Sequence, residues 1–471
     1  MYTGGYTGKI LRLDLTNQKA TEEEVTLELA SRYMGGVGFA FKYLYDEFPP
    51  GTDALDADNI LAFAVGPLNA TGSPCANRMA VASKSPLTNS IACALSGGHF
   101  PDALKQAGYD MVLVQGRAPK PTYVFIADGQ VRFRSASKLM GMQTSDTQLF
   151  IKEELRDPGV RVACIGPAGE NRVLFAAVMN DHGRAAGRTG LGAVMGAKNL
   201  KAIAIEGNGS QDLPAGKDYS ALYADIFRKL TDTDMMRKYH NLGTASNLEA
   251  LNELKALPWR NLQATSDPGI TGISGQRFAD DTLLRNAACS GCPVGCIHIG
   301  FVREKFHADN QYLYRQVGYD YEPIFATGSM LGLTKAPEVL TVMDEVEKVG
   351  LDVMSAGVAL AWATEALEHG LVSVEQTGVG LRFGEVEGYL KAMPMLAGGV
   401  NEFWRLLAAG TMAAARHYGG QDFACVLGQE MAGYATGEVF YVAQSLGLRH
   451  SHLDTGDYSY DQSNAPKDVT K

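Results

Sequence analysis

Three cysteines stand close together in the segment AACSGCPVGC, where Cys289, Cys292 and Cys296 form a C-x2-C-x3-C run. Thiolates at such short spacing commonly hold metal, and a four-iron four-sulfur cluster takes four cysteine ligands. The glycines and the proline of the segment suit a tight loop folded around a cluster. We therefore predict a 4Fe-4S cluster with three local ligands, a fourth ligand from elsewhere in the chain, and a role in electron transfer.

Two other interpretations of this cysteine run remain open. Zinc could recruit His298 to complete a Cys3His set, although zinc motifs usually supply their ligands as two separated pairs. The cysteines could also carry no metal. The chain has seven cysteines, spread singly apart from this run, which is not the pattern of a disulfide framework and favours a reducing compartment.

Two segments rich in arginine and glycine are a second source of chemistry. They are TGSPCANRMAVASKSPLT followed by ALSGGHF, and NDHGRAAGRTGLGAVMGAKNLKAI. In the second segment Arg184, Arg188 and exposed main-chain amides precede a short predicted helix, and both guanidinium groups and helix N-termini favour phosphate. Neither segment is a dinucleotide fingerprint or a P-loop. Taken alone, each is equally consistent with ordinary surface charge and ordinary turns.

The type of secondary structure that the sequence predicts, which must position these residues, changes along the chain. Residues 1–208 hold short apolar or alternating runs divided by turns, which predict a β-rich domain with few helices, at residues 26–47, 102–107 and 144–155. From residue 209 the pattern has three- and four-residue periodicity, which predicts helices. We expect an α+β fold, with a helical domain carrying the cysteine run over residues 209–420 and the start of a further helical domain over residues 421–471. The final SYDQSNAPKDVTK is expected to be a polar tail or a cut end.

Composition narrows the classes of function. The chain has 471 residues, 46% of them hydrophobic, and a net charge of −10. These values are normal for a soluble globular enzyme and argue against nucleic acid or an anionic membrane as the main partner. The N-terminus has no apolar run after a basic start, and no apolar stretch is long enough to span a membrane, so we expect a cytoplasmic protein.

Taken together, the motifs resemble the aldehyde ferredoxin oxidoreductase family of tungsten enzymes. The resemblance rests on the two arginine- and glycine-rich segments, on WRNLQ, CSGCPVGC, YDYEPIFATGS and EKVGLD, and it runs in family order from residue 4 to about residue 455. It implies tungsten, or less often molybdenum, held by two pterins, with a 4Fe-4S cluster nearby. It also implies a magnesium ion that bridges the pterin phosphates, an N-terminal β domain that forms the base for both pterins, and helical domains that cover them.

The resemblance assigns cofactor-binding roles to particular residues. Arg78 corresponds to the arginine between cluster and pterin, and the carbonyls of Leu95 and Ala185 correspond to the magnesium ligands, although Leu95 stands where a polar residue is expected. The resemblance also points to the pterin motif EKVGLD, in which Glu347 replaces the usual first acid and Asp352 is retained. Without the resemblance, EKVGLD would be interpreted as the end of a helix with Gly350 as its C-cap. The full set of expected cofactor-binding residues is Arg78, Leu95, Ser96, Gly97, Arg184, Ala185, Arg188, Glu347 and Asp352.

The resemblance also implies a substrate site. Glu322 and His452 match the acid and the histidine of the family's pocket, and they would act as an acid–base pair on an aldehyde, with Tyr321 as an alternative group to polarise the carbonyl. The implied reaction oxidises an aldehyde to a carboxylic acid and passes electrons through the cluster to ferredoxin or to an iron-sulfur partner subunit. Without the resemblance, Glu322 is a loop carboxylate, and His450 with His452 could be a surface pair.

One departure from the family concerns the fourth cluster ligand. Family members continue beyond the position of His452 and carry the fourth cysteine there, so this chain is either a truncated form or fragment, or its cluster uses a substitute. Cys75, Cys93, Cys164 and Cys425 do not match that position, and Cys75 lies nearest the cofactor by sequence. Two other functions therefore stay open: a catalytic subunit that reduces an aromatic thioester within a larger complex, and a truncated homologue that binds cofactor without turnover. A homodimer and an anaerobic way of life are further expectations.

Overall fold

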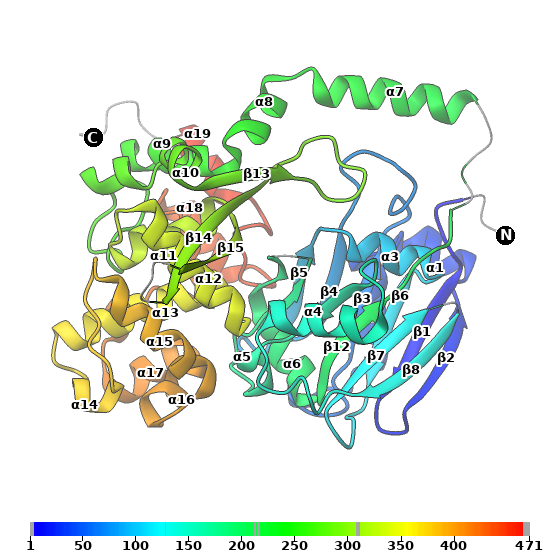
Figure 1. Cartoon of the computed structure of the whole chain (residues 1–471), viewed down its shortest axis with the longest axis horizontal. Helices are drawn as coiled ribbons and strands as arrows, with labels where there is room; N and C mark the ends of the chain where they lie inside the picture. The colour runs from blue at the N-terminus through cyan, green and yellow to red at the C-terminus, as the bar shows by residue number, and fades with distance from the viewer. Residues whose placement is uncertain are drawn as a thin grey trace. The chain divides into compact units, whose positions relative to one another are not determined.

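The computed structural model describes residues 4–127, 129–181, 183–211, 213, 217–307 and 311–464. The chain divides into two compact units (Figure 1). The first unit is Met1–Arg237 with Ala288–Gly295, and the second unit is Lys238–Ala287 with Cys296–Lys471. The short segment Ala288–Gly295, which carries Cys289 and Cys292, therefore belongs to the first unit although it lies far along the sequence.

Two six-stranded sheets form the framework of the first unit. The first sheet has the order β2-β1-β6-β3-β4-β5 and consists of β1 (Lys9–Asp14), β2 (Lys19–Glu24), β3 (Leu61–Val65), β4 (Met79–Lys84), β5 (Ile91–Ser96) and β6 (Met111–Gln115). The second sheet has the order β11-β10-β9-β12-β7-β8 and consists of β7 (Thr122–Ala127), β8 (Gln130–Ser135), β9 (Arg161–Cys164), β10 (Val178–Asn180), β11 (Arg184–Ala186) and β12 (Leu200–Ile205). Central strands such as β3 are buried along their whole length, which explains their continuous apolar sequences.

Helices cover these sheets and fill the space between them. The helices are α1 (Leu27–Tyr33), α2 (Val37–Glu47), α3 (Phe100–Gln106), α4 (Thr144–Leu155), α5 (Pro167–Glu170), α6 (Leu191–Ala197) and α7 (Lys217–Thr231), and α8 (Asp234–Asn241) leads into the second unit. One core joins both sheets through α3 and α6, with Leu104 and Leu191 inside it. A second core packs Phe39 of α2 against the first sheet, and a third packs Ile151 of α4 against the second sheet.

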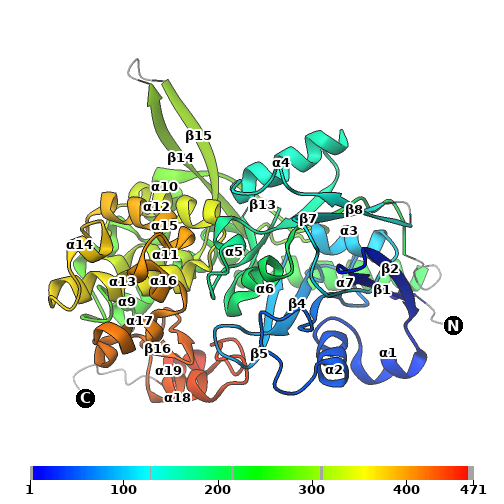
Figure 2. The same ribbon diagram turned by 90° about the horizontal axis from the view of Figure 1, so that it is seen from below.

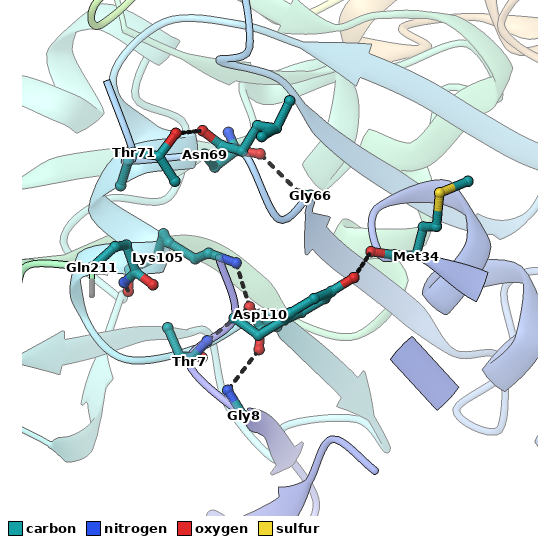
Figure 3. Close-up of polar contacts among 12 residues, drawn as sticks. Thr7, Gly8, Met34, Gly66, Asn69, Thr71, Lys105, Asp110 and Gln211 are labelled. Atoms are coloured by element: carbon teal, nitrogen blue, oxygen red, sulfur yellow. Dashed lines mark hydrogen bonds and ion pairs between the residues drawn. The ribbon is translucent and has the colours of Figure 1, made fainter. Parts of the chain in front are cut away.

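A buried ion pair anchors the N-terminal segment to the first sheet. The Lys105 ammonium contacts the Asp110 carboxylate, and both side chains are fully buried. Asp110 also accepts main-chain hydrogen bonds from Thr7 (3.3 Å) and Gly8 (2.9 Å), as Figure 3 shows. Burial lowers the pKa of Lys105, and Asp110 opposes that effect. The Asp110 carboxylate of this pair therefore provides hydrogen-bond acceptors for main-chain amides of the segment that enters β1.

The second unit is mostly helical. Its helices are α9 (Asn247–Glu253), α10 (Gly275–Thr282), α11 (Tyr321–Thr327), α12 (Ala336–Val349), α13 (Val353–Glu368), α14 (Val374–Thr377), α15 (Val386–Gly398), α16 (Glu402–Ala408), α17 (Thr411–Tyr418), α18 (Glu438–Leu446) and α19 (Asp457–Asn464). A three-stranded antiparallel sheet has the order β13 (Leu283–Ala287), β14 (Ile297–His307) and β15 (Gln311–Tyr319). Figure 2 shows β14 and β15 extending side by side away from the helices of this unit. A short ladder joins β16 (Val426–Leu427) to β17 (Gln429–Glu430).

The expected α+β fold is confirmed, with three differences in detail. The helix expected over residues 26–47 is two helices, because Met34, Gly35 and Gly36 all have positive φ and break it. The strands β13–β15 fall in the part expected to be helical. The tail SYDQSNAPKDVTK is helical to Asn464, and its residues 465–471 lie outside the described residues. The boundaries at residues 208 and 420 stay predictions. Among the described residues, no helix is both long and apolar enough to cross a membrane.

Candidate functional site

The cysteine loop is held by the glycine segment that follows β5. The main-chain N–H of Ser290 donates to the carbonyl of Gly98 (3.1 Å), and the N–H of Gly98 lies 3.3 Å from the Sγ of Cys289. Both contacts lie within the first unit. Two segments that the sequence singled out separately, LSGGH and CSGC, are therefore one structural feature.

Gly97 packs against the cysteine loop. A Cβ added at Gly97 would lie 2.8 Å from the Sγ of Cys289. Such a distance is shorter than ordinary van der Waals contact, so an alanine at this position would require the Cys289 thiol to move. The pterin-binding role of Gly97 stays a prediction. Ser96 is likewise occupied inside the unit, since its hydroxyl donates to the Oδ1 of Asn180 (2.6 Å).

Cys75 lies beside the cysteine loop. Its Sγ is 3.8 Å from the Sγ of Cys292, and both residues belong to the first unit. Cys75 is exposed, and its φ of +60° is in the left-handed region. Across the described ranges, no group of three or more His, Cys, Asp or Glu side chains is arranged as a metal site. The third motif residue, Cys296, belongs to the second unit.

His298 does not support the zinc interpretation. Its Nε2 lies 3.1 Å from the carbonyl oxygen of His240 and 3.0 Å from that of Asn241, and its Nδ1 lies 3.1 Å from the carbonyl oxygen of Cys296. The ring is buried, with 1% of the residue exposed. Each ring nitrogen thus faces a main-chain acceptor, whereas a zinc ligand must direct a lone pair at the metal.

The expected magnesium ligands lie on two edge strands. Leu95 is in β5, at the edge of the first sheet, and Ala185 is in β11, at the edge of the second sheet. The two strands pack beside each other. An edge strand leaves alternate carbonyl groups without a strand partner, and a hard cation accepts such oxygens. The side chain of Leu95 is 43% exposed although its strand is otherwise largely buried.

The arginine- and glycine-rich segment after β10 is more buried than its sequence suggested. Residues 189–197, which include all of α6, are buried. A Cβ at Gly190 would lie 2.0 Å from the carbonyl oxygen of Leu174, and a Cβ at Gly196 would lie 1.9 Å from that of Gly169. These glycines therefore permit close packing of α6, and the amides at its start are not the exposed ones we expected. The Nε of Arg184 is buried and has no hydrogen-bond partner among the described residues. Arg188 lies in the 3-10 turn Arg188–Gly190.

Arg78 directly precedes β4 and its side chain is exposed. Its neighbour Asn77 is only 5% exposed, and neither polar atom of the Asn77 side chain has a hydrogen-bond partner among the described residues. Sequence analysis did not single out Asn77. Only its position in the ANRMA motif could have indicated it.

Glu322, Tyr434 and His452 come together within the second unit. Glu322 is in the first turn of α11, where its Oε1 accepts a hydrogen bond from the hydroxyl of Tyr434 (2.9 Å). The Nε2 of His452 lies 3.6 Å from the same oxygen, which is ion-pair distance but too long for a good hydrogen bond. Neither ring nitrogen of His452 has a hydrogen-bond partner among the described residues, although the side chain is 2% exposed. The structure thus brings together the two residues that sequence expected to act together.

The surroundings of Glu322 keep its carboxyl group ionised. Burial raises the pKa of Glu322, but His452 and the hydrogen bond from Tyr434 outweigh burial, so the pKa lies below its ordinary value. Burial, together with the charge of Glu322, raises the pKa of Tyr434 well above its ordinary value. Tyr434 therefore stays a protonated donor, and the ring of Tyr458 stacks on it at 4.3 Å.

Tyr321 lies inside the second unit, and its role toward a substrate stays a prediction. It is fully buried, and its hydroxyl donates to the carbonyl of Gly433. Tyr434, which sequence analysis missed, is the tyrosine whose hydroxyl meets Glu322. It lies more than one hundred residues from Glu322, and no local sequence pattern connects the two.

The motif EKVGLD forms the junction between α12 and α13. Gly350, with φ +77°, is the C-cap of α12, as expected for a helix end without the resemblance. Asp352 is the N-cap of α13, where its Oδ2 accepts from the main-chain N–H of Ser355 (3.1 Å). Glu347 lies in the last turn of α12. Asp352 thus has a structural role, and the pterin-binding roles of Glu347 and Asp352 stay predictions.

A separate cavity of about 320 Å³ lies in the second unit around the WRNLQ motif. Asn261 lines it and donates from Nδ2 to the Oε2 of Glu365 (2.6 Å). Asn261 and its neighbours Arg260 and Leu262 all have positive φ, which is rare in consecutive residues other than glycine. Glu322 and His452 do not line this cavity.

Most of the chain matches two models of one protein family. Residues 10–207 match "Aldehyde ferredoxin oxidoreductase, N-terminal domain", and residues 221–468 match "Aldehyde ferredoxin oxidoreductase, domains 2 & 3". The tungsten-containing aldehyde ferredoxin oxidoreductase of Pyrococcus abyssi is 38% identical over 391 residues, which cover 81% of this chain and 63% of that relative. The enzyme of the same name from Pyrococcus furiosus is 36% identical over 424 residues, which cover 88% and 68%. This chain thus spans about two thirds of the length of these relatives.

Two further similarities are to subunits of larger assemblies. The aliphatic sulfonate oxidoreductase, WOR-like subunit, of Pyrococcus furiosus is 29% identical over 473 residues, which cover 97% of this chain and 73% of that relative. A solved structure of the active site complex BamBC of benzoyl coenzyme A reductase, with 1,5-dienoyl-CoA, has a TM-score of 0.80 and 26% identity and covers 94% of this chain and 69% of that chain.

Proposed function

We propose that this chain, which belongs to the aldehyde ferredoxin oxidoreductase family, oxidises an aldehyde to a carboxylic acid and passes the electrons through a 4Fe-4S cluster to ferredoxin or to a partner subunit. The observation that carries the proposal is the group of Glu322, Tyr434 and His452. It joins a carboxylate with a lowered pKa to a protonated phenol and a buried imidazole. A base and hydrogen-bond donors are the groups that carbonyl oxidation requires.

The residues present fit the pterin cofactor and the magnesium ion that the family implies. Within the first unit, the Nε of Arg184 and the amide group of Asn77 are buried polar atoms without partners among the described residues, so they are available to a polar ligand. The edge strands β5 and β11 offer main-chain carbonyls to a magnesium ion. Within the second unit, the imidazole of His452 is a buried polar group of the same kind. When bound, the tungsten bis-pterin group supplies a two-electron acceptor, and the cluster relays the electrons singly.

The side chains of the second unit account for the protons of the reaction. Oxidation of an aldehyde takes its oxygen atom from water and gives the carboxylic acid, two protons and two electrons, which pass to the electron acceptor. Glu322, ionised at neutral pH, accepts a proton at its carboxylate from the attacking water. His452 at Nε2 orients the carbonyl oxygen or holds the second proton, because this nitrogen has no other hydrogen-bond partner among the described residues. Tyr434 fixes the Glu322 carboxylate through its 2.9 Å hydrogen bond.

Metal analysis and turnover of the anaerobically purified chain test the proposal. We expect about four irons and one tungsten per chain, and aldehyde-dependent reduction of benzyl viologen. Glu322→Gln keeps the shape of the side chain and removes its charge, so it should lower kcat by about 10²- to 10⁴-fold with metal content unchanged. Glu430→Gln is the matched control, because Glu430 is also buried but accepts from the amide of Thr411 (3.0 Å). Zinc in place of iron and tungsten, or full aldehyde oxidation by Glu322→Gln, would refute the proposal.

A second candidate function has one observation in its favour. The similarity to the BamBC active site complex is consistent with a catalytic subunit that reduces an aromatic thioester within a larger assembly. This candidate predicts that the purified chain, given a low-potential electron donor, reduces an aromatic coenzyme A thioester and leaves aldehydes unchanged. The third candidate, a homologue that binds cofactor without turnover, predicts tungsten in the protein and neither reaction.

A further inference from the structure

We propose that Tyr458 is a positioning residue, whose ring holds Tyr434 and His452 where both meet the carboxylate of Glu322. The proposal rests on the proposed function and adds a residue to its acid–base group, which is Glu322, Tyr434 and His452. The rings of Tyr458 and Tyr434 are stacked, with centroids 4.3 Å apart and planes at 26°. The ring centroid of Tyr458 also lies 5.7 Å from that of His452. One side chain therefore lies against both of the groups that meet the Oε1 of Glu322.

Tyr434 is enclosed by aromatic rings. Phe440 of α18 meets its ring edge-on at 6.0 Å, and the ring of Tyr321 lies 5.1 Å away. Stacked and edge-to-face pairs are the arrangements that aromatic rings prefer, so each neighbour limits the rotation of the Tyr434 ring. Tyr321, Phe440 and Tyr434 are buried, whereas Tyr458 is half-buried. Tyr458 is thus the outermost of these rings, and its replacement should loosen Tyr434 without emptying the core.

The helix that carries Tyr458 is fixed to α18. The two helices α18 and α19 pack beside each other (Figure 2), and the Oδ2 of Asp461 in α19 accepts from the main-chain N–H of Phe440 (2.9 Å). This amide belongs to the first turn of α18, whose N-cap residue Gly437 has no side chain to cap it. A Cβ added at Gly437 would lie 2.8 Å from the Cγ of Asp461. The neighbouring helix therefore caps α18, and this bond sets the position of α19 and of Tyr458.

The loop that carries His452 is fixed through its main chain. Asp454 accepts hydrogen bonds from the main-chain N–H (3.1 Å) and from the Nε (2.6 Å) of Arg449. Both ring nitrogens of His452 lack a hydrogen-bond partner among the described residues. The imidazole lies against the rings of Tyr434 (5.4 Å) and Tyr458 (5.7 Å). Its orientation toward the carboxylate therefore depends on aromatic packing, to which Tyr458 contributes.

Tyr458 acts through its ring and not through a charge. Burial raises the pKa of Tyr458, and the charge of Glu322 and the nearby Tyr239 add to that effect, so its hydroxyl stays protonated. Burial also raises the pKa of Glu322, but His452 and the hydrogen bond from Tyr434 outweigh it. A Tyr434 hydroxyl that turns away no longer opposes burial, so the pKa of the carboxyl group should rise. The titratable groups around this carboxylate come from several elements, and they are Tyr321, Tyr434, His452 and Tyr458.

Infrared difference spectroscopy of the full-length protein tests the proposal without turnover. The pH at which the protonated carboxyl band appears reports the pKa of Glu322, and Glu322→Gln, which lacks this band, is the reference. Tyr458→Leu fills much of the space but cannot stack, so the band should appear about one pH unit higher than in the wild type. Tyr458→Phe keeps the ring and should match the wild type. Tyr460→Leu changes an exposed tyrosine of the same helix and is the control.

Steady-state kinetics of aldehyde oxidation measures the consequence at the site. Tyr458→Leu should lower kcat by about 10- to 100-fold with KM little changed, because displacement of a catalytic group by about 1 Å can cost about 10²-fold. The acidic limb of the pH–rate profile should move to higher pH together with the infrared band. In the double variant with Tyr434→Phe, the total loss should be smaller than the product of the two single losses, since Tyr458 acts partly through Tyr434.

The outcomes distinguish this proposal from the proposed function. An unchanged infrared band in Tyr458→Leu, or the same displacement of the band in Tyr458→Phe, would overturn the positioning role. The expected displacement in a protein that contains tungsten but does not oxidise aldehydes would refute the aldehyde reaction and leave the role of Tyr458 in place. Asp461→Ala keeps the Tyr458 ring and frees α19, so it should move the band in the same direction. A band at the wild-type pH in that variant would overturn the proposal even if Tyr458→Leu failed to fold.

Discussion

Replacing Gly97 with alanine should destabilise the cysteine loop. The added Cβ would lie 2.8 Å from the Sγ of Cys289, whereas non-bonded heavy atoms of this kind prefer about 3.5–4.0 Å. The Cys289 thiol, or the loop that carries it, must therefore move by roughly 1 Å. Overpacking of this kind costs about 1–3 kcal/mol, and each kcal/mol lowers the midpoint of thermal unfolding by about 2–4 °C for a unit of this size. Because Cys289 is an expected cluster ligand, iron content should fall as well.

A double-mutant cycle in the metal-free protein isolates this contact. Cys289→Ala removes the sulfur atom, so Gly97→Ala should cost about 1–3 kcal/mol in the wild type and markedly less in the Cys289→Ala background. Gly66→Ala is the control in the same unit, because its Cβ would lie at an ordinary 3.6 Å from the Oδ1 of Asn69. Effects of Gly97→Ala and Cys289→Ala that add within about 0.5 kcal/mol would refute the steric argument.

Three further perturbations test other parts of the structure. Asp110→Ala leaves the Lys105 ammonium buried without its carboxylate and should cost about 3–5 kcal/mol in urea unfolding, whereas Lys105→Met combined with Asp110→Asn should cost clearly less. Burial lowers the pKa of Lys198 to about 8, while an unfolded lysine keeps its proton to about 10.4. The unfolded state thus binds more protons over this range, so the contribution of Lys198 to stability rises with pH from about 8 to 10.4. Lys198→Met should abolish that rise, and an identical pH dependence in both proteins would contradict the assignment. Asp352→Asn keeps the N-cap of α13 and removes a charge, so stability should change by less than about 0.5 kcal/mol while bound pterin falls. Full pterin retention would leave Asp352 with a purely structural role.

Local patterns in the sequence predicted much of the framework. The short apolar runs before residue 208 became strands because several of them are buried on both faces. The periodic segments over residues 336–352 and 357–370 form most of α12 and α13. Gly350 ends α12 as its C-cap, as a glycine at the end of such a segment predicts. The strands β13–β15 were missed because their pairing joins residues up to about twenty positions apart, and no local period reports such pairing.

The sequence alone determined which residue types were present for chemistry: the clustered thiols, the acid of YDYEPIF, and His452. Residue type and spacing carry that information because ligand and acid–base chemistry belong to the side chain itself. Only the tertiary structure decided which of these groups meet. It placed Tyr434 on Glu322, gave the Tyr321 hydroxyl to Gly433, and brought Cys75 to within 3.8 Å of Cys292. Contacts between residues more than one hundred positions apart depend on the packing of the whole unit. No local stretch of sequence contains the interactions that determine them.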